Sequence, residues 1–151
     1  MAKQFTGSRF MTAPPPAGFG VEFQMLDDNS IQAQVVFGLE KEGPPGHVHG
    51  GALAAVLDEA MGSACFAIGR PGLSATITVD YKSPVPLNVE VVLYGQVTKT
   101  EGRKTYTYAK IVLPDGSIAA ESTGIFVFSQ ELYDKILSLL ESEEPRTNDA
   151  P

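Results

Sequence analysis

Apolar residues recur at helical spacing between residues 50 and 67, and this pattern predicts one long helix. The apolar positions form a single face, which comprises Leu53, Val56, Leu57, Ala60, Met61, Ala64, Cys65 and Ile68. The run Gly69-Arg70-Pro71-Gly72 ends the helix, because glycine suits the stop position and proline cannot continue a helix. A second, short helix is predicted over 130–140, where Ser129 can cap the first turn.

Alternating apolar and polar residues predict strands on both sides of the long helix. The strands are expected at 19–26, 31–38, 73–82, 87–99, 103–113 and 117–128. This order predicts an α+β fold in which an antiparallel sheet wraps around one long central helix. Because such a sheet leaves edge strands open, we expect two chains to pair as a homodimer.

The two ends of the chain differ in composition from its middle. Residues 1–18 are polar and then proline-rich, which is typical of a leader that lies on the surface or is partly ordered. Residues 19–140 are expected to form a single domain, and residues 141–151 form an acidic tail.

Composition narrows the classes of protein that the chain can belong to. Its 151 residues are 43% apolar, which is enough for a core without a metal or a disulfide. The single cysteine, Cys65, falls on the apolar helix face, so we expect a buried thiol and a reducing compartment. No apolar run reaches the roughly 18 residues of a membrane span, and the N-terminus lacks a signal-peptide core. We therefore expect a cytoplasmic protein without a membrane partner.

The net charge of −7 argues against non-specific binding to nucleic acid. Part of the acidic excess lies in the tail, so a local basic site for an anionic ligand remains compatible with the composition.

The sequence His49-Gly50-Gly51 stands where the long helix begins. The first N–H groups of a helix have no internal acceptor, and glycine lets a ligand come close to the backbone. This pattern indicates an anion site or an oxyanion hole for a thioester or ester carbonyl. The alternative is that the two glycines merely permit a tight turn, and taken alone they favour it.

Two adjacent acids, Asp58 and Glu59, interrupt the apolar helix. Asp58 lies about 12 Å along the helix axis from Gly50 at 1.5 Å per residue, so the two cannot reach one carbonyl within a chain. If both serve one reaction, they must come from different chains of a dimer. The alternative is a solvated or hydrogen-bonded structural acid, and spacing alone does not choose between Asp58 and Glu59.

Residues 43–62, together with the strand Leu73–Leu87 and its Tyr81-x-x-Pro84 end, resemble acyl-CoA thioesterases of the hot-dog fold. The resemblance covers roughly residues 35–128, and the PaaI-like enzymes and the mammalian thioesterase-superfamily members are the most similar groups. It implies a hot-dog fold and hydrolysis of an acyl-CoA thioester. It also implies pairing of two chains, and two such dimers often form a homotetramer.

The resemblance also implies roles for individual residues. Gly50 matches the glycine whose N–H polarises the thioester carbonyl, and Asp58 matches the catalytic acid, which acts as base or nucleophile. His49 matches the histidine that orients the thioester or the loop. Ser74 matches a residue that holds the attacking water, with Thr76 as the alternative because a slip of two residues keeps the same strand face.

One departure from the family pattern concerns Gly43, where many PaaI-like enzymes have asparagine. His49 is then expected to matter more. His47, two residues earlier, is expected to be a loop residue. The pair does not predict a metal site, because no third ligand lies nearby in the sequence.

Coenzyme A is part of the substrate in this hypothesis, and no separate cofactor is expected. The candidate coenzyme A contacts are Arg103, Lys104, Lys82 and Gly51, with Lys99 and Arg70 as further cations. A solvated turn is the alternative for the basic residues. The acyl pocket is expected near Met61, Ala64 and Cys65.

Two other functions remain open at this stage: a non-catalytic acyl-CoA-binding module and a hot-dog dehydratase or hydratase. Dehydratases of this fold usually pair a catalytic histidine with a helix acid. The acid pattern here matches the thioesterase groups better.

Overall fold

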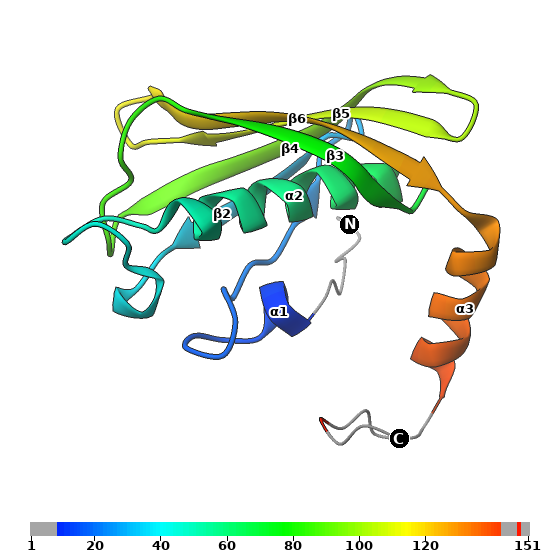
Figure 1. The fold of residues 1–151 in the computed structure, drawn as a ribbon, viewed down its shortest axis with the longest axis horizontal. Coiled ribbons are helices and arrows are strands. Elements are labelled where there is room, and N and C mark those ends of the chain that lie inside the picture. The colour runs from blue at the N-terminus through cyan, green and yellow to red at the C-terminus, as the bar shows by residue number, and fades with distance from the viewer. Residues whose placement is uncertain (1–8, 143–147, 149–151) are drawn as a thin grey trace.

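In the computed structural model, one long helix lies along one face of a six-stranded antiparallel sheet (Figure 1). The structure describes residues 9–142 and residue 148. Its elements are α1 (Arg9–Thr12), β1 (Gln24–Met25), β2 (Ile31–Val36), the 3-10 turn η1 (Leu39–Lys41), α2 (Gly50–Ala67), β3 (Gly72–Tyr81), β4 (Glu90–Glu101), β5 (Lys104–Val112), β6 (Ile118–Phe128) and α3 (Gln130–Glu141). The predicted α+β architecture and the long central helix are therefore confirmed.

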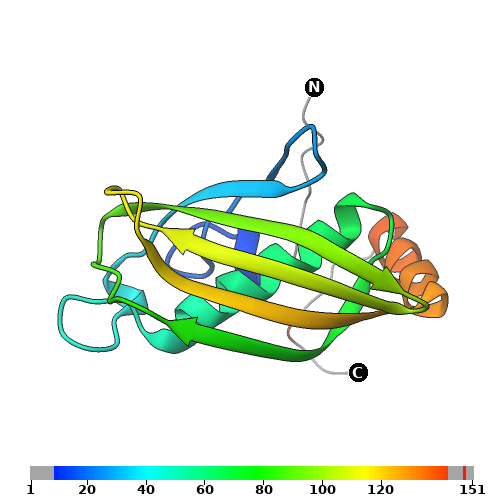
Figure 2. The same ribbon diagram turned by 90° about the horizontal axis from the view of Figure 1, so that it is seen from above.

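The strands follow the order β1-β2-β4-β5-β6-β3, and every neighbouring pair is antiparallel. In the view from above, β3 runs along one edge of the sheet, and α2 crosses beneath it (Figure 2). Most residues of β3 are exposed. One long side of β3 thus has no strand beside it within the described chain.

The core lies between α2 and the sheet. The apolar face predicted for the helix is buried there, including Leu57, Ala60 and Met61. Gly95 on β4 makes this close contact possible, because a Cβ at that position would lie 2.6 Å from the Ala60 carbonyl oxygen. Cys65 is also buried and free of any disulfide, as the sequence predicts.

The first predicted strand, 19–26, is wrong over most of its length, since only Gln24–Met25 pair in the sheet. The alternation in this segment does bury Phe19 and Val21. Its backbone bonds to the preceding segment instead, because the Val21 N–H donates to the Met11 carbonyl at 3.0 Å. A buried alternating segment therefore need not be a strand.

The same contact joins the later part of the predicted leader to the core. Met11 is only 1% exposed and belongs to the core. Residues 1–8 of the predicted leader lie outside the described residues, as does most of the predicted acidic tail.

Helix α3 agrees with the predicted 130–140, and the Ser129 hydroxyl accepts a hydrogen bond from the Leu132 N–H at 3.2 Å. The helix leads away from the sheet after β6 (Figure 1). No helix in the described part of the chain is long and apolar enough to cross a membrane.

Candidate active site

The loop before α2 is a rigid turn docked onto the segment that follows β3. The His47 N–H donates to the Pro44 carbonyl at 2.9 Å, and Gly46 has φ +79°, which fits a type II turn. The Val48 N–H then bonds the Val85 carbonyl at 2.9 Å. The start of α2 is consequently held both by the turn in the loop before it and by the segment that follows β3.

His49 caps the helix. Its backbone is extended, with φ −60° and ψ 135°, and its Nδ1 accepts a hydrogen bond from the Gly51 N–H at 2.8 Å. The Gly51 N–H, predicted as a ligand contact, is therefore already occupied by this imidazole. The Gly50 N–H has no acceptor in the first helical turn, and the hydrogen bonds of the described residues give it no other. It is available as the donor that the sequence predicts.

Tyr81 holds the same helix end from the strand side. Its hydroxyl donates to the Gly50 carbonyl oxygen at 2.8 Å, and its ring lies about 3.5 Å from where a Cβ on Gly50 would be. The sequence singled out Tyr81 only as part of a motif. Its contact joins two elements far apart in the chain, so only the folded structure could reveal it.

The departure at Gly43 has a steric reason in this fold. A Cβ at this position would lie 2.7 Å from the His49 Cα, which is closer than side chains come to a backbone. The loop therefore closes against His49, and an asparagine at position 43 would require the backbone to shift.

Asp58 lies partly buried on α2, and its Oδ1 is buried without a hydrogen-bond partner among the described residues. Burial raises the pKa of Asp58 above its ordinary value, and a hydrogen bond from the Ser74 side chain opposes that rise. The structure thus brings together two residues that the sequence proposed separately. A partly buried carboxylate with a raised pKa is typical of functional sites.

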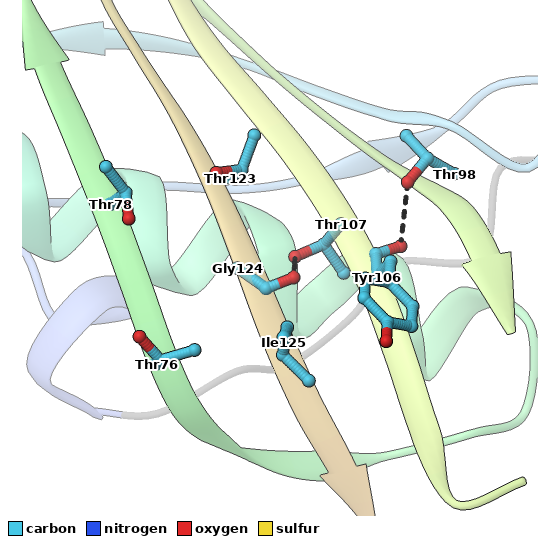
Figure 3. A pocket seen from close by; sticks show the side chains of 8 residues that line it. All are labelled: Thr76, Thr78, Thr98, Tyr106, Thr107, Thr123, Gly124 and Ile125. Atoms are coloured by element: carbon cyan, nitrogen blue, oxygen red, sulfur yellow. Dashed lines mark hydrogen bonds between the residues drawn. The ribbon is translucent and has the colours of Figure 1, made fainter. Parts of the chain in front are cut away.

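A β-bulge explains why Ser74 reaches the helix. The register of β3 against β6 shifts between Ser74 and Thr76, so that Ser74 lies opposite the buried Phe126 and Thr76 lies opposite Ile125. Thr76 instead lines a hollow on the sheet face away from α2 (Figure 3). The prediction that both residues share a face is therefore wrong, because the bulge breaks the alternation.

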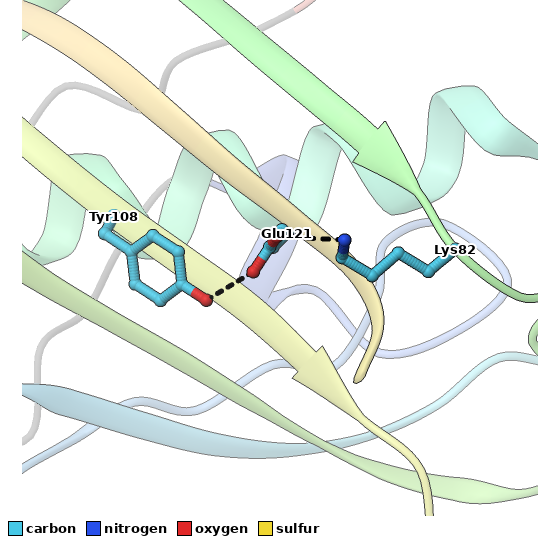
Figure 4. Close-up of polar contacts among 3 residues, drawn as sticks. All are labelled: Lys82, Tyr108 and Glu121. Atoms are coloured by element: carbon cyan, nitrogen blue, oxygen red, sulfur yellow. Dashed lines mark hydrogen bonds and ion pairs between the residues drawn. The ribbon is translucent and has the colours of Figure 1, made fainter. Parts of the chain in front are cut away.

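Lys82 is held on the outer face of the sheet rather than near Gly50. Its Nζ lies 3.2 Å from Glu121, which also accepts a hydrogen bond from the Tyr108 hydroxyl at 2.7 Å (Figure 4). These contacts lower the pKa of Glu121, the Tyr108 bond being the larger influence. The charge of Lys82 is consequently compensated within the chain.

The other cations gather near the far end of α2. Arg70 bonds the Gly102 carbonyl at 2.5 Å and the Thr105 hydroxyl at 3.2 Å, so it ties the β4–β5 turn to the helix end. Arg103 and Lys104 are exposed at that turn. Within one chain they therefore lie at the opposite end of α2 from Gly50.

The residues expected around the acyl group do not line an opening in the described chain. Met61, Ala64 and Cys65 are fully buried against the sheet. Burial raises the pKa of Cys65 to about 12, which leaves its thiol unreactive. An acyl group would therefore have to contact residues other than Met61, Ala64 and Cys65, which the sequence suggested.

The chain thus carries two separate half-sites. We call His49, Gly50 and Tyr81 together the helix-start half-site, and Asp58 and Ser74 together the acid half-site. About 12 Å of helix separates Gly50 from Asp58.

Comparisons with known proteins identify the family of the chain. A family model described as "Thioesterase superfamily" matches residues 45–120, which contain Gly50, Asp58 and Ser74. The "Acyl-coenzyme A thioesterase THEM4" of Xenopus laevis is 35% identical over 114 residues, covering 73% of this chain and 51% of the relative. The chain accordingly spans about half the length of the curated relatives it matches.

Two solved structures show the same fold. The thioesterase superfamily protein RHA08564 has a TM-score of 0.69 and 36% identity, over 71% of this chain and 53% of that chain. The Escherichia coli PaaI protein has a TM-score of 0.68 and 18% identity, over 74% of this chain and 80% of that chain. The match over half of the sequence, together with the shared fold, shows that the chain belongs to the thioesterase superfamily.

Proposed function

We propose that this protein is an acyl-CoA thioesterase, which hydrolyses a thioester to a free acid and coenzyme A. One observation carries the proposal: Asp58 has a buried carboxylate oxygen without a partner among the described residues and a hydrogen bond from Ser74. It stands on a helix whose first N–H, that of Gly50, has no acceptor in the described part of the chain. The similarity to a relative named acyl-coenzyme A thioesterase supports the substrate class. The match covers only 51% of that relative, so the activity of the present chain rests on its own site.

Gly50 supplies the oxyanion donor in this proposal. Its N–H lies at the positive end of α2, so it binds the thioester carbonyl oxygen and stabilises the negative charge that develops there. Tyr81 and the His49 cap keep this end of the helix in place.

Asp58 supplies the base or the nucleophile. As a base, it takes a proton from water while the water oxygen bonds to the carbonyl carbon; the carbon–sulfur bond then breaks and coenzyme A leaves as the thiolate. As a nucleophile, the carboxylate attacks the carbon directly, and water later hydrolyses the resulting anhydride. Both routes need ionised Asp58, and Ser74 holds the water in each.

The complete site requires a second chain, because Gly50 and Asp58 lie too far apart along one helix. The edge strand β3 supports this pairing. It is ten residues long and mostly exposed, and Leu73 on it is 63% exposed. We infer a homodimer in which the helix-start half-site of each chain faces the acid half-site of its partner.

Thiol release from a panel of acyl-CoA thioesters tests the proposal. Replacing Asp58 by asparagine keeps the shape but removes the charge, so kcat should fall by about 100-fold or more. Asp80→Asn is the matched control, since Asp80 is an exposed acid on β3, and it should retain activity within about twofold.

Near-normal hydrolysis by Asp58→Asn would contradict the role of Asp58. Binding of acyl-CoA without any thiol release by the wild-type chain would favour a non-catalytic binding module. Hydration of an enoyl-CoA without thiol release would favour a hydratase.

A further inference from the structure

A short series of hydrogen bonds connects Tyr81 to the imidazole of His49. The Tyr81 hydroxyl donates to the Gly50 carbonyl at 2.8 Å, and the Gly51 N–H donates to His49 Nδ1, also at 2.8 Å. The Gly50 carbonyl and the Gly51 N–H are the two ends of one peptide group. Tyr81 and His49 are thus bonded to opposite sides of the same rigid plane.

We propose that Tyr81 is a positioning residue that fixes the tautomer of His49, so that His49 presents an Nε2–H donor beside the Gly50 N–H. The catalytic part of this inference rests on the proposed function. The tautomer itself is a property of the protein without substrate.

The chemistry of the bond determines the tautomer. A backbone N–H can only donate, so His49 Nδ1 must accept and therefore carries no proton. The ring proton of neutral His49 is left on Nε2. This holds only while the Gly51 bond is formed, and Tyr81 keeps it formed: its hydroxyl holds the carbonyl end of the same peptide and polarises the N–H at the other end. Without that hydroxyl the peptide can turn, the bond breaks part of the time, and both tautomers of His49 occur.

The packing around the ring supports the same role. A Cβ on Gly51 would lie 3.0 Å from His49 Nδ1, and a Cβ on Gly43 would lie 3.3 Å from the ring Cδ2. Side chains at either position would push the imidazole out of line with the Gly51 N–H. The second glycine of the His-Gly-Gly sequence therefore serves His49 rather than the ligand.

His47 provides an internal reference, because its tautomer is opposite. Its Nδ1 lies 3.0 Å from the Pro45 carbonyl oxygen, which can only accept, so Nδ1 carries the proton there. The chain contains two histidines in all, and their ring nitrogens should give opposite patterns in one spectrum.

The test combines nitrogen-15 NMR of the imidazoles with steady-state kinetics on the full chain, at a pH where both rings are neutral. In the wild type, His49 should be protonated at Nε2 and His47 at Nδ1. Tyr81→Phe should give His49 a mixture of both tautomers and leave His47 unchanged. Because the lost interaction acts mainly in the transition state, kcat should fall about tenfold while KM changes less than about twofold.

Tyr108→Phe is the matched control. It also removes a hydroxyl hydrogen bond from the sheet, but on the face away from α2, and both readouts should stay at their wild-type values. The amide spectrum checks that each variant is folded.

If Tyr81→Phe keeps a pure Nε2–H tautomer at His49, or keeps kcat, the proposal is overturned. A wild-type chain that releases no thiol would refute the proposed function and the catalytic role together. The imidazole spectrum would still decide whether Tyr81 fixes His49, so the two failures are distinguishable.

Discussion

Asp58 is the residue on which the account of the site rests. A buried carboxylate oxygen without a partner lowers stability, so its presence on an otherwise apolar helix calls for a functional reason. The sequence could identify this acid as out of place. It could not choose between Asp58 and Glu59 by spacing; the resemblance to the thioesterases favours Asp58, which receives a hydrogen bond from Ser74.

The hydrogen bond from Ser74 gives a prediction for the pH dependence of hydrolysis. Burial raises the pKa of Asp58 and Ser74 lowers it, so removing the hydroxyl in Ser74→Ala should raise this pKa further. Asp58 would then stay protonated to a higher pH. The acidic limb of the pH profile of kcat/KM, which reports the base in the free enzyme, should move to higher pH.

Thr76→Ala is the matched control for this measurement, because the bulge turns Thr76 to the other face of the sheet. Its acidic limb should coincide with that of the wild type. An acidic limb that moves to lower pH in Ser74→Ala, or stays in place, would show that Ser74 does not act on Asp58.

The bulge also shows why the sequence alone misjudged this strand. A two-residue slip preserves the face of a strand only when the alternation is continuous. The extra residue between Ser74 and Thr76 is set by pairing with β6, which lies some fifty residues further along the chain. No local pattern near Ser74 encodes it.

At the level of the elements, helix α2 was predictable because its period and its flanking glycines are local signals. The structure gives it the bounds Gly50–Ala67, which agree with the predicted helix. The first strand failed for the opposite reason, since its partners are residues of the preceding segment. The partners of the basic residues within the chain could not be predicted either. Lys82 pairs with Glu121 on β6, and Arg70 bonds the β4–β5 turn, so both contacts join segments far apart in the sequence.

The start of α2 allows a clean test of the oxyanion donor. Proline is favoured at the first helical position and lacks the N–H, and His49 already has the extended backbone that a residue before proline adopts. Gly50→Pro should therefore leave the fold intact and lower kcat by about 100-fold, as loss of an oxyanion donor does.

Gly50→Ala is the control, since it keeps the N–H. The added Cβ would meet the Tyr81 ring at about 3.5 Å, an ordinary contact, so activity should stay within a few-fold of wild type. Equal losses in the two variants would argue that position 50 matters for packing and not for its N–H.

The whole molecule presents one long edge strand and two half-sites. The sequence predicted a sheet with open edges from the order of its elements, and β3 is such an edge. It could not predict which edge would be long and exposed, because that depends on the crossover that places β3 beside β6. Pairing of two chains through β3 stays a prediction. Only such pairing would bring the helix-start half-site of one chain next to the acid half-site of the other.

Mixing two inactive variants tests that central claim most directly. In a chain that carries Asp58→Asn the helix-start half-site is intact, and in a chain that carries Gly50→Pro the acid half-site is intact. After the two purified chains are unfolded and refolded together, a mixed dimer has one complete site and one with both defects. Random pairing should restore about a quarter of the wild-type activity per chain. Each variant refolded alone should remain inactive. If mixed dimers form, as shown by mass spectrometry, and activity does not return, Gly50 and Asp58 do not serve one site across two chains.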